Sequence, residues 1–422
     1  MRQRPERERW SAADAERHLL ARERFGMRFG LDRMHRLMNV LELPTVPYPS
    51  VHVVGTNGKS STTRMIAALL ERHGLRTGCF TSPHLLSYRE RIRISERDIA
   101  PERFAAAVAR TMAAAEPVDR TAAEPGDAVT QFELLTAAAL CEFARAKVDV
   151  AVLEAGLGGR FDATNIVDSR VAVLTNVGLE HTRYLGPTVR DIAIEKLAVV
   201  RRDATLVVGA GLDPEALAVA RSVVAGWGGG PIQAQPQVDV ELRAGGSYQA
   251  RNFATAVAAA QAFLGPGFDG ATRASAAAEV SVPGRFEVHD GRPVTVFDSA
   301  HNDGGIEALV DSLPGFVRWR RLVAVVSILD DKDAGGMLRR LLARCDALVA
   351  TACTSPRALP AATLASLAGQ LGRAATVAPE PHRALALAAD LAGPDGVVLA
   401  TGSIYLIADL LRPEGAGGGS TL

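Results

Sequence analysis

The order of apolar and polar positions along the chain predicts an α/β protein. An apolar, β-branched run at 51–54 breaks into a glycine-containing turn and continues as a helical pattern over 63–72, as expected where a strand leads into a helix. Short apolar runs at 77–80, 148–153 and 171–177 repeat the strand pattern. The run at 148–153 is nearly all apolar, which is typical of a strand buried on both faces of a parallel sheet.

Helical spacing recurs between these strands. It is found in the region 11–43, at 132–146 and in an Ala-rich stretch at 249–263. The segments 116–129 and 226–236 contain Pro and Gly instead, and we expect them to be connections.

The pattern changes after Pro283-Gly284-Arg285 to a regular alternation of strands and helices. Strand candidates in this region lie at 294–297, 322–328, 347–350 and 397–400. Such alternation predicts a smaller C-terminal Rossmann-like α/β domain. The chain has 422 residues, more than one hydrophobic core usually supports. We therefore expect two domains, residues 1–284 with a mainly parallel sheet and residues 285–422.

The turn after the first strand, Gly55-Thr56-Asn57-Gly58-Lys59-Ser60-Ser61, has the features of a phosphate-binding P-loop. Its glycines let backbone N–H groups point inward, and the N-terminus of the following helix adds partial positive charge. Lys59 adds a full charge, and Ser60 or Ser61 offers a hydroxyl to a phosphate-bound Mg²⁺. Val53 replaces the first glycine of the full pattern. An isolated Gly-Lys turn is usually a surface loop, but the flanking strand and helix favour ATP binding.

Polar residues follow the neighbouring strands. Ser82 and His84 come just after the strand at 77–80, beside a proline. Residues beside a proline are usually simple turn residues, but this position makes them candidates for the crevice that holds the phosphate loop. Glu154 ends the strand at 148–153. Because an unpaired buried carboxylate is costly, we expect it to face the crevice and hold Mg²⁺ on the nucleotide phosphates.

The next strand ends near Glu180-His181. A histidine in a loop is usually solvated or a helix cap, but its place at a strand end, like that of Glu154, favours a metal or phosphate contact. Lys196 lies on a short helical stretch and has two interpretations. It pairs with a nearby acid, or it faces the metal crevice, where a carbamate formed with CO₂ would convert a repelled ammonium into a carboxylate ligand.

Two further polar patterns stand out. Arg89, Arg91 and Arg93 alternate with apolar residues, which predicts a strand with one polar face. Their charges are either solvated or form a clamp for an acidic substrate. In the second region, the strand at 294–297 leads into the polar cluster 298–302, again at the carboxyl end of a strand.

Composition narrows the class of protein. A hydrophobic content of 48% with only 5% aromatic residues fits an Ala/Val/Leu-rich α/β protein. The 47 basic and 47 acidic residues cancel, so we expect no nucleic-acid or membrane partner. The four cysteines lack metal-binding spacing and indicate reduced thiols. No signal-peptide pattern or bilayer-spanning apolar run is found. We expect a cytoplasmic protein and, since no oligomer surface is indicated, a monomer.

Together these motifs resemble the folylpolyglutamate synthase and dihydrofolate synthase family of the Mur ligase superfamily. The resemblance runs from about residue 31 to about residue 412. The matching stretches in the first domain are 55–59, 81–85, 90–92, 132–133, 154–165, 185–186 and 192–196. Those in the second domain are 283–285, Asp298 with 301–302, 331–333, 356–360 and 401–403. Their order and spacing carry the resemblance, since each stretch alone is weak.

The resemblance implies an ATP-dependent amide ligase. In such enzymes the γ-phosphate of ATP passes to a carboxylate of a pterin or folate substrate, and the amine of L-glutamate attacks the acyl phosphate. The first domain would then be an ATP-binding Mur-ligase-like domain and the second a glutamate-ligase domain. Phosphoryl transfer needs positioning and charge neutralisation more than a nucleophilic side chain.

The resemblance also implies roles for single residues. Lys59 would neutralise the transferring phosphoryl group, Ser82 and Glu154 would hold a first Mg²⁺, and His181 with a carbamylated Lys196 would hold a second. The implied nucleotide contacts are Thr56, Asn57, Gly58, Lys59, Ser60, Ser61, Asn252, Arg285 and Asp298. The implied substrate contacts are Ser82, Pro83, His84, His301 and Ser403.

Some positions depart from the family pattern. Ser60 and Ser299 replace glycines, Glu180 replaces an aspartate, and the segment 212–248 is short. The acceptor therefore stays open: dihydropteroate, reduced folates, both, or a different carboxylate in a specialised pathway. A nucleotide-gated binding protein without ligase activity is a further alternative. The presence of all four expected phosphate and metal residues speaks against it: Lys59, Glu154, His181 and Lys196.

Overall fold

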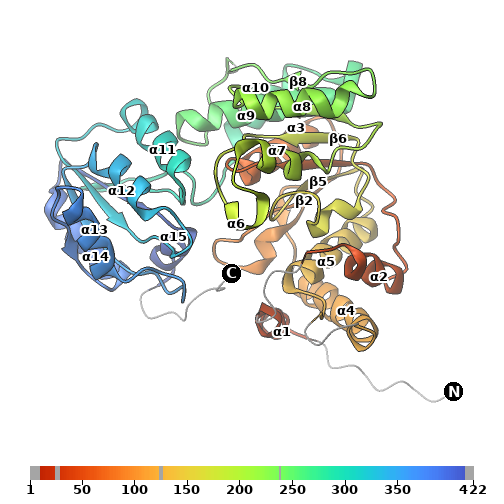
Figure 1. The fold of residues 1–422 in the computed structure, drawn as a ribbon, viewed down its shortest axis with the longest axis horizontal. Helices are drawn as coiled ribbons and strands as arrows, with labels where there is room; N and C mark the ends of the chain where they lie inside the picture. The colour runs from red at the N-terminus through yellow and green to blue at the C-terminus, as the bar shows by residue number, and fades with distance from the viewer. Residues whose placement is uncertain (1–9, 24–28, 123–126, 237–238, 414–422) are drawn as a thin grey trace. The chain divides into compact units, whose positions relative to one another are not determined.

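The computed structural model describes residues 10–23, 29–122, 127–236 and 239–413, and the chain divides into two compact units, each with its own sheet (Figure 1). The first unit comprises Met1–His84, Tyr88–Val240 and Arg251–Ala276. The second comprises Leu85–Ser87, Glu241–Ala250 and Ala277–Leu422. Residues 277–284 thus group with the second unit, whereas the sequence pattern placed them in the first.

The first unit is built on an eight-stranded sheet with the order β4-β3-β2-β5-β1-β6-β7-β8. Its strands are β1 Ser50–Val54, β2 Thr77–Phe80, β3 Ile92–Ile94, β4 Arg97–Asp98, β5 Val150–Glu154, β6 Val171–Leu174, β7 Thr205–Val208 and β8 Ile232–Gln233. β3 is antiparallel to both of its neighbours, β2 and β4, and the other neighbouring strands of the sheet are parallel. The expected mainly parallel sheet is confirmed, and β1 lies between β5 and β6.

Two hydrophobic clusters lie on the same face of this sheet, because Leu153 in the first and Ala172 in the second both pair with His52 of β1. The helices that contribute to this unit are α1 Ala12–Glu23, α2 Asp32–Val40, α3 Lys59–Arg72, α4 Pro101–Arg120, α5 Gln131–Ala146, α6 Thr182–Leu185, α7 Val189–Leu197, α8 Pro214–Ala225, α9 Ser247–Leu264 and α10 Thr272–Glu279. The first cluster packs α1, α2, α4 and α5 against β2 and β5, and the second packs α7 and α8 against β6 and β7. Three short 3₁₀ turns are η1 Tyr88–Arg91, η2 Ala163–Ile166 and η3 Gly265–Gly267.

Three predicted elements differ in the structure. The predicted connection at 226–236 contains the two-residue strand β8, which pairs with β7. The predicted connection at 116–129 is helical as far as Arg120, because α4 continues through Pro117 to bury Ala115 and Val118 in the first cluster; residues 123–126 lie outside the described part of the chain. The predicted alternating strand at 88–94 is wrong in its first half, where η1 precedes the short β3.

The second unit has a six-stranded sheet with the order β13-β12-β11-β14-β10-β9, parallel except for β9. Its strands are β9 Glu287–His289, β10 Val294–Phe297, β11 Leu322–Val326, β12 Ala347–Ala350, β13 Thr376–Val377 and β14 Val397–Thr401. Its helices are α11 Asp303–Phe316, α12 Ala334–Leu342, α13 Ala361–Gln370, α14 Pro381–Ala392 and α15 Ile404–Leu411. The predicted Rossmann-like alternation is confirmed.

Across the described residues, none of the helices is both long and apolar enough to cross a bilayer. The four cysteines are free and buried.

Candidate active site

The phosphate loop joins β1 to α3 and depends on two glycines. Gly58 caps α3 with φ of 79°, in the left-handed region that disfavours other residues. A Cβ at Gly58 would lie 2.4 Å from Asn252 Oδ1, so α9 approaches the loop too closely for a side chain. A Cβ at Gly55 would lie 1.9 Å from Thr175 Oγ1. The loop is therefore shaped by contacts from α9 and from the end of β6.

Residues just after β6 hold the loop by hydrogen bonds. Asn57 N donates to Asn176 Oδ1 at 2.8 Å, and Thr175 Oγ1 donates to Asn57 O at 2.7 Å. Thr56 Oγ1 accepts from Gly178 N at 3.0 Å. The sequence pattern missed Thr175 and Asn176, although their position at a strand's carboxyl end was a usable signal.

Lys59 is the first residue of α3. Its Nζ donates to Gly55 O and to Thr56 O, each at 3.1 Å. The ammonium therefore lies over the carbonyl groups of the loop, at the helix end that favours anions. Ser61 is buried, whereas the Ser60 hydroxyl donates to Glu154 Oε1 at 2.9 Å. Of the two serines that the sequence left open, Ser60 contacts the expected metal carboxylate.

Glu154 ends β5 and is 1% exposed. Its second oxygen, Oε2, accepts from the backbone N–H of Ser82 at 3.0 Å. The structure thus brings Ser60, Ser82 and Glu154 together, as the sequence predicted for Ser82 and Glu154. Carboxylate and hydroxyl oxygens at the end of a parallel strand, beside a phosphate loop, fit a hard divalent cation.

Lys196 lies on α7 and is 4% exposed. Its Nζ donates to Gly55 O at 2.7 Å, so Lys59 and Lys196 share one carbonyl acceptor. Burial and then the charge of Lys59 lower the pKa of Lys196 to about 7, against the opposing effect of Glu180 and Asp162. A large share of this buried amine is therefore neutral near pH 7.

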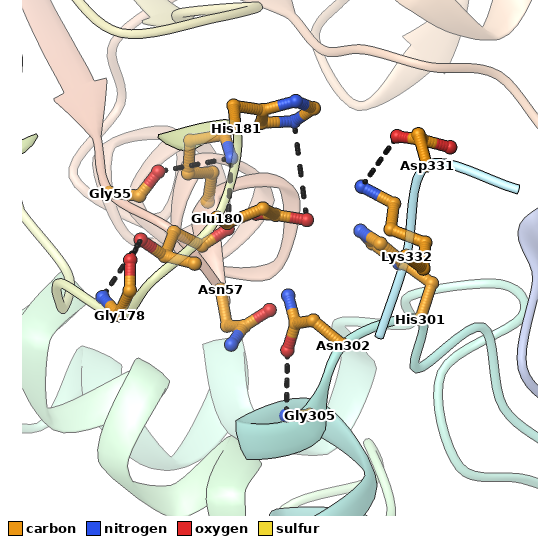
Figure 2. A network of polar contacts seen from close by, with 12 residues as sticks. Gly55, Asn57, Gly178, Glu180, His181, His301, Asn302, Gly305, Asp331 and Lys332 are labelled. Atoms are coloured by element: carbon orange, nitrogen blue, oxygen red, sulfur yellow. Dashed lines mark hydrogen bonds and ion pairs between the residues drawn. The ribbon is translucent and has the colours of Figure 1, made fainter. Parts of the chain in front are cut away.

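Glu180 and His181 lie in the loop after β6. His181 caps α6 with φ of 51°, and its Nε2 lies 4.0 Å from Glu180 Oε1 (Figure 2). Figure 2 shows both residues near Gly55 and Asn57 of the phosphate loop. Within the described residues, no group of three or more His, Cys, Asp or Glu side chains is arranged to hold a metal.

Other expected residues make contacts inside the first unit. Arg91 is buried, its Nε donates to His84 Nδ1 at 2.9 Å, and the His84 ring lies 4.2 Å from that of Tyr88. Arg89 Nε donates to Ile99 O at 2.8 Å, and Arg93 pairs with Asp98 at 3.1 Å. The three arginines thus have partners within the protein. This arrangement differs from both sequence-based interpretations, a solvated polar face and a clamp for an acidic substrate. Pro83 is exposed.

The residues expected in the second unit surround the end of β10. Asp298 is buried, and it accepts from Tyr248 Oη at 2.5 Å, from Phe286 N at 2.8 Å and from Ala300 N at 2.7 Å. It therefore fixes the segment that carries Arg285. His301 Nδ1 lies 2.9 Å from Ser299 O. Ser403 is buried and caps α15, where its Oγ accepts from Tyr405 N at 3.2 Å.

Two neighbouring contacts in the second unit are drawn in Figure 2. Asn302 Oδ1 accepts from Gly305 N at 2.8 Å and thereby caps α11. Lys332 Nζ lies 3.4 Å from Asp331 Oδ2. The polar cluster after β10 is thus ordered by capping and by short local contacts.

The chain matches two known domain families. The sequence profile of the Mur ligase middle domain matches residues 53–210, and that of the Mur ligase glutamate ligase domain matches residues 284–404. The chain is 37% identical over 377 residues to the dihydrofolate synthase/folylpolyglutamate synthase of Mycobacterium tuberculosis, which covers 81% of this chain and 77% of that protein.

Solved structures agree in fold. M. tuberculosis folylpolyglutamate synthase complexed with ADP has a TM-score of 0.89 at 33% identity and covers 97% of this chain and 99% of that one. A bifunctional folylpolyglutamate synthase/dihydrofolate synthase from Yersinia pestis, complexed with AMPPNP and Mn ion, has a TM-score of 0.82 at 29% identity and covers 95% and 97%. The two family matches, which cover both α/β units and the phosphate loop, show that the chain is a Mur ligase. Within that class, the chain belongs to the dihydrofolate synthase/folylpolyglutamate synthase family.

Proposed function

We propose that this chain is an ATP-dependent ligase that joins L-glutamate to the carboxylate of a pterin substrate, either dihydropteroate, a reduced folate or both. The observation that carries the proposal is the convergence of Lys59, Glu154 and Lys196 on one phosphate loop. The family relationship supports the same chemistry, since the relatives named above are synthases of this type.

ATP would bind with its phosphates on the loop between β1 and α3, where backbone N–H groups and the helix N-terminus favour an anion. Lys59 would neutralise the γ-phosphoryl group as it transfers. Thr56, Asn57, Gly58, Ser60 and Ser61 complete the loop, and we assign further nucleotide contacts to Asn252, Arg285 and Asp298. The close packing of Asn252 on Gly58 supports the first of these three assignments.

The Y. pestis relative was solved with a Mn ion, and we propose that this enzyme uses Mg²⁺. We assign Ser82 and Glu154 to a first ion, and His181 with a carbamylated Lys196 to a second. Bound there, the ions would neutralise the phosphate oxygens. The contacts among Ser60, Ser82 and Glu154 support the first site, because they bring the Ser60 hydroxyl and the backbone of Ser82 next to a buried carboxylate.

The environment of Lys196 supports its carbamylation. A buried ammonium beside Lys59 is unfavourable, and the lowered pKa of about 7 leaves a neutral amine. That amine would add to CO₂, forming an N–C bond and losing a proton, so that a cation becomes an anion. The change removes the repulsion from Lys59 and supplies a carboxylate-like ligand.

After phosphoryl transfer to the substrate carboxylate, the glutamate amine would attack the acyl phosphate and release phosphate. No protein nucleophile is required, because positioning and charge neutralisation account for catalysis of this kind. We assign Ser82, Pro83 and His84 to the pterin side, and His301 and Ser403 to the glutamate side. We further propose that the enzyme acts as a monomer in the cytoplasm, in keeping with its four free buried cysteines.

ADP release by the purified protein tests the proposal. We expect release that requires both L-glutamate and dihydropteroate or a reduced folate. The alternative, a related ligase for another carboxylate, predicts glutamate-dependent release only with a different acid and is kept because the segment 212–248 is short. Absence of acid-dependent ADP release with a broad panel of pterins and other acids would contradict the ligase assignment.

A further inference from the structure

We propose that His52 is a positioning residue: through Thr164 and Asp162, it fixes the loop at 155–165 that braces Lys196 against the phosphate loop. The proposal rests on the proposed function only in treating Lys196 as part of the metal site. All of these residues belong to the first unit.

His52 is the central residue of β1 and has no exposed surface. The other strand positions around it are Val51, Val53 and Val54, and an apolar side chain at position 52 would avoid the cost of burying an imidazole. Buried polar groups are kept where they are hydrogen-bonded. His52 Nε2 lies 2.7 Å from the hydroxyl oxygen of Thr164, a residue of η2 that is also fully buried.

The direction of this contact follows from the next one. Thr164 Oγ1 donates its proton to Asp162 Oδ1 in a short hydrogen bond. Its oxygen must therefore accept from His52, which places the imidazole proton on Nε2. Nδ1 has no hydrogen-bond partner among the described residues, and a proton there would be a buried donor without an acceptor, which also favours the proton on Nε2. Burial, together with the charge of Arg201, lowers the pKa of His52 to about 3, so the ring is a fixed neutral donor.

Asp162 connects Thr164 to the loop at 155–165 by hydrogen bonds. Its Oδ1 also accepts from Thr164 N at 3.0 Å, and its Oδ2 accepts from Leu157 N at 2.8 Å. The carboxylate thus joins the beginning of the loop to η2 at its end. Asp162 is buried, where hydrogen bonds of this kind are strong and their loss is costly.

The middle of the loop packs directly on α7. A Cβ at Gly159 would lie 2.5 Å from Lys196 O and 2.7 Å from Glu195 O. The backbone of the loop at Gly159 therefore packs directly against the backbone of α7. Arg160 N donates to Glu195 O at 3.0 Å, and Arg160 Nε donates to Glu195 Oε1 at 2.8 Å. The loop therefore holds the helical turn that carries Lys196.

Lys196 connects this series of contacts back to the end of β1. Its Nζ donates to Gly55 O, and Gly55 directly follows β1, the strand of His52. The contacts form a closed circuit from β1 through Thr164, Asp162 and the loop to Lys196 and back. A break at the buried His52–Thr164 link would loosen Lys196 without removing any metal ligand.

The test uses Thr164→Val, which removes the hydroxyl at nearly constant shape, and Thr164→Ser, which keeps it. Binding of AMPPNP is measured by calorimetry across a Mg²⁺ series and in EDTA. We expect Thr164→Val to raise the half-saturating Mg²⁺ concentration about 10-fold or more, as for other residues that position a metal ligand. Thr164→Ser should stay within about twofold of the wild type, and the affinity in EDTA should not change.

His52→Leu and His52→Gln provide a second pair that keeps the test valid if Thr164→Val does not fold. Leucine removes the donor, whereas glutamine offers an N–H in its place, so only His52→Leu should shift the Mg²⁺ requirement. Amide exchange should quicken in α7 and stay unchanged in α13, which belongs to the second unit. An unshifted Mg²⁺ requirement in folded Thr164→Val or His52→Leu protein would overturn the proposal, whatever their thermal stability.

The assay contains no pterin or glutamate, so its outcome does not depend on the acceptor. Wild-type protein that binds Mg²⁺ and AMPPNP but ligates no pterin would refute the proposed substrate. The proposed role of His52 would still be tested by the same variants. Wild-type protein without Mg²⁺-dependent AMPPNP binding would also overturn the proposal that these contacts position Lys196 for a metal ion.

Discussion

Lys196 Nζ donates a 2.7 Å hydrogen bond to the carbonyl oxygen of Gly55, the residue at which the phosphate loop begins. Lys59 Nζ contacts the same oxygen. Burial of Lys196, and then the charge of Lys59 beside it, disfavour the ammonium form and lower the pKa of Lys196. Two of the predictions below, on the activity of Lys196→Ala and on the pH dependence of stability, follow from this arrangement.

Lys196→Ala should lose ligation by about 100-fold or more, because the variant cannot form the carbamate that holds the second ion. Short carboxylic acids such as acetate or formate should partly restore turnover by placing a carboxylate in the vacated space. Steady-state rates with and without added acid measure both effects. Full activity of the untreated variant would rule out the carbamate.

The lowered pKa of Lys196 also predicts a pH-dependent stability. In the unfolded chain the lysine titrates near 10.5, and in the folded protein near 7. Between these values the unfolded state binds one more proton, so the folded state gains up to roughly 1.4 kcal/mol per pH unit relative to a variant without the amine. Below pH 7 both the folded and the unfolded state bind the proton, so the full cost of burying the charged amine of Lys196 remains.

Urea unfolding of the wild type and Lys196→Met in CO₂-free buffer measures this difference. Lys196→Met should be the more stable protein at pH 7. The wild type should recover about 2 kcal/mol of that deficit by pH 9. A difference that stays constant from pH 7 to pH 9 would show that the amine is not perturbed by burial.

Glu154→Gln should retain the fold, because the amide oxygen keeps one acceptor for Ser60 or Ser82. It should nevertheless lose Mg²⁺-dependent turnover by about 100-fold, since the charge that attracts the cation is gone. Glu142→Gln is a matched control, because Glu142 is also buried but pairs with Arg103 on α4. That control should lose stability and keep its Mg²⁺ requirement, whereas an unchanged Mg²⁺ response in Glu154→Gln would remove Glu154 from the metal site.

Gly58→Ala should abolish nucleotide binding for two separable reasons. The positive φ costs roughly 1–2 kcal/mol for a residue with a Cβ, and the new methyl group would overlap Asn252 Oδ1. Because Asn252 is itself assigned to the nucleotide, the overlap is isolated by comparing the effect of Gly58→Ala in the wild type and in Asn252→Ala, where the overlap is removed and the backbone strain is kept. The loss of AMPPNP affinity should be smaller in the Asn252→Ala background, and an equal loss in both backgrounds would show that Asn252 does not limit the space at the loop.

The local part of the site could be predicted from the sequence. The phosphate loop and Glu154 each follow a strongly apolar run, and parallel strands place their carboxyl ends at one edge of the sheet. The same logic led to Ser82 and His181. The prediction of these residues depends on the order of the strands along the chain and on their periodicity, which short stretches of sequence encode.

Long-range contacts could not be predicted in this way. The link from His52 to Thr164 joins residues 112 positions apart, and His52 itself looks like one polar residue in an apolar strand. The pattern at 88–94 was misleading because a period of two over a few residues fits a 3₁₀ turn followed by a short strand as well as a long strand. The assignment of 241–250 to the second unit likewise reflects contacts, since its local composition does not distinguish it.

The most direct measurement of the central claim follows one oxygen atom. Dihydropteroate labelled with ¹⁸O in its carboxylate is incubated with the enzyme, ATP, Mg²⁺ and L-glutamate, and the released phosphate is analysed by mass spectrometry. Activation as an acyl phosphate predicts one ¹⁸O in each phosphate and a pterin product that has gained one glutamate. Unlabelled phosphate alongside the ligated product, or ADP release without ligation, would contradict the account.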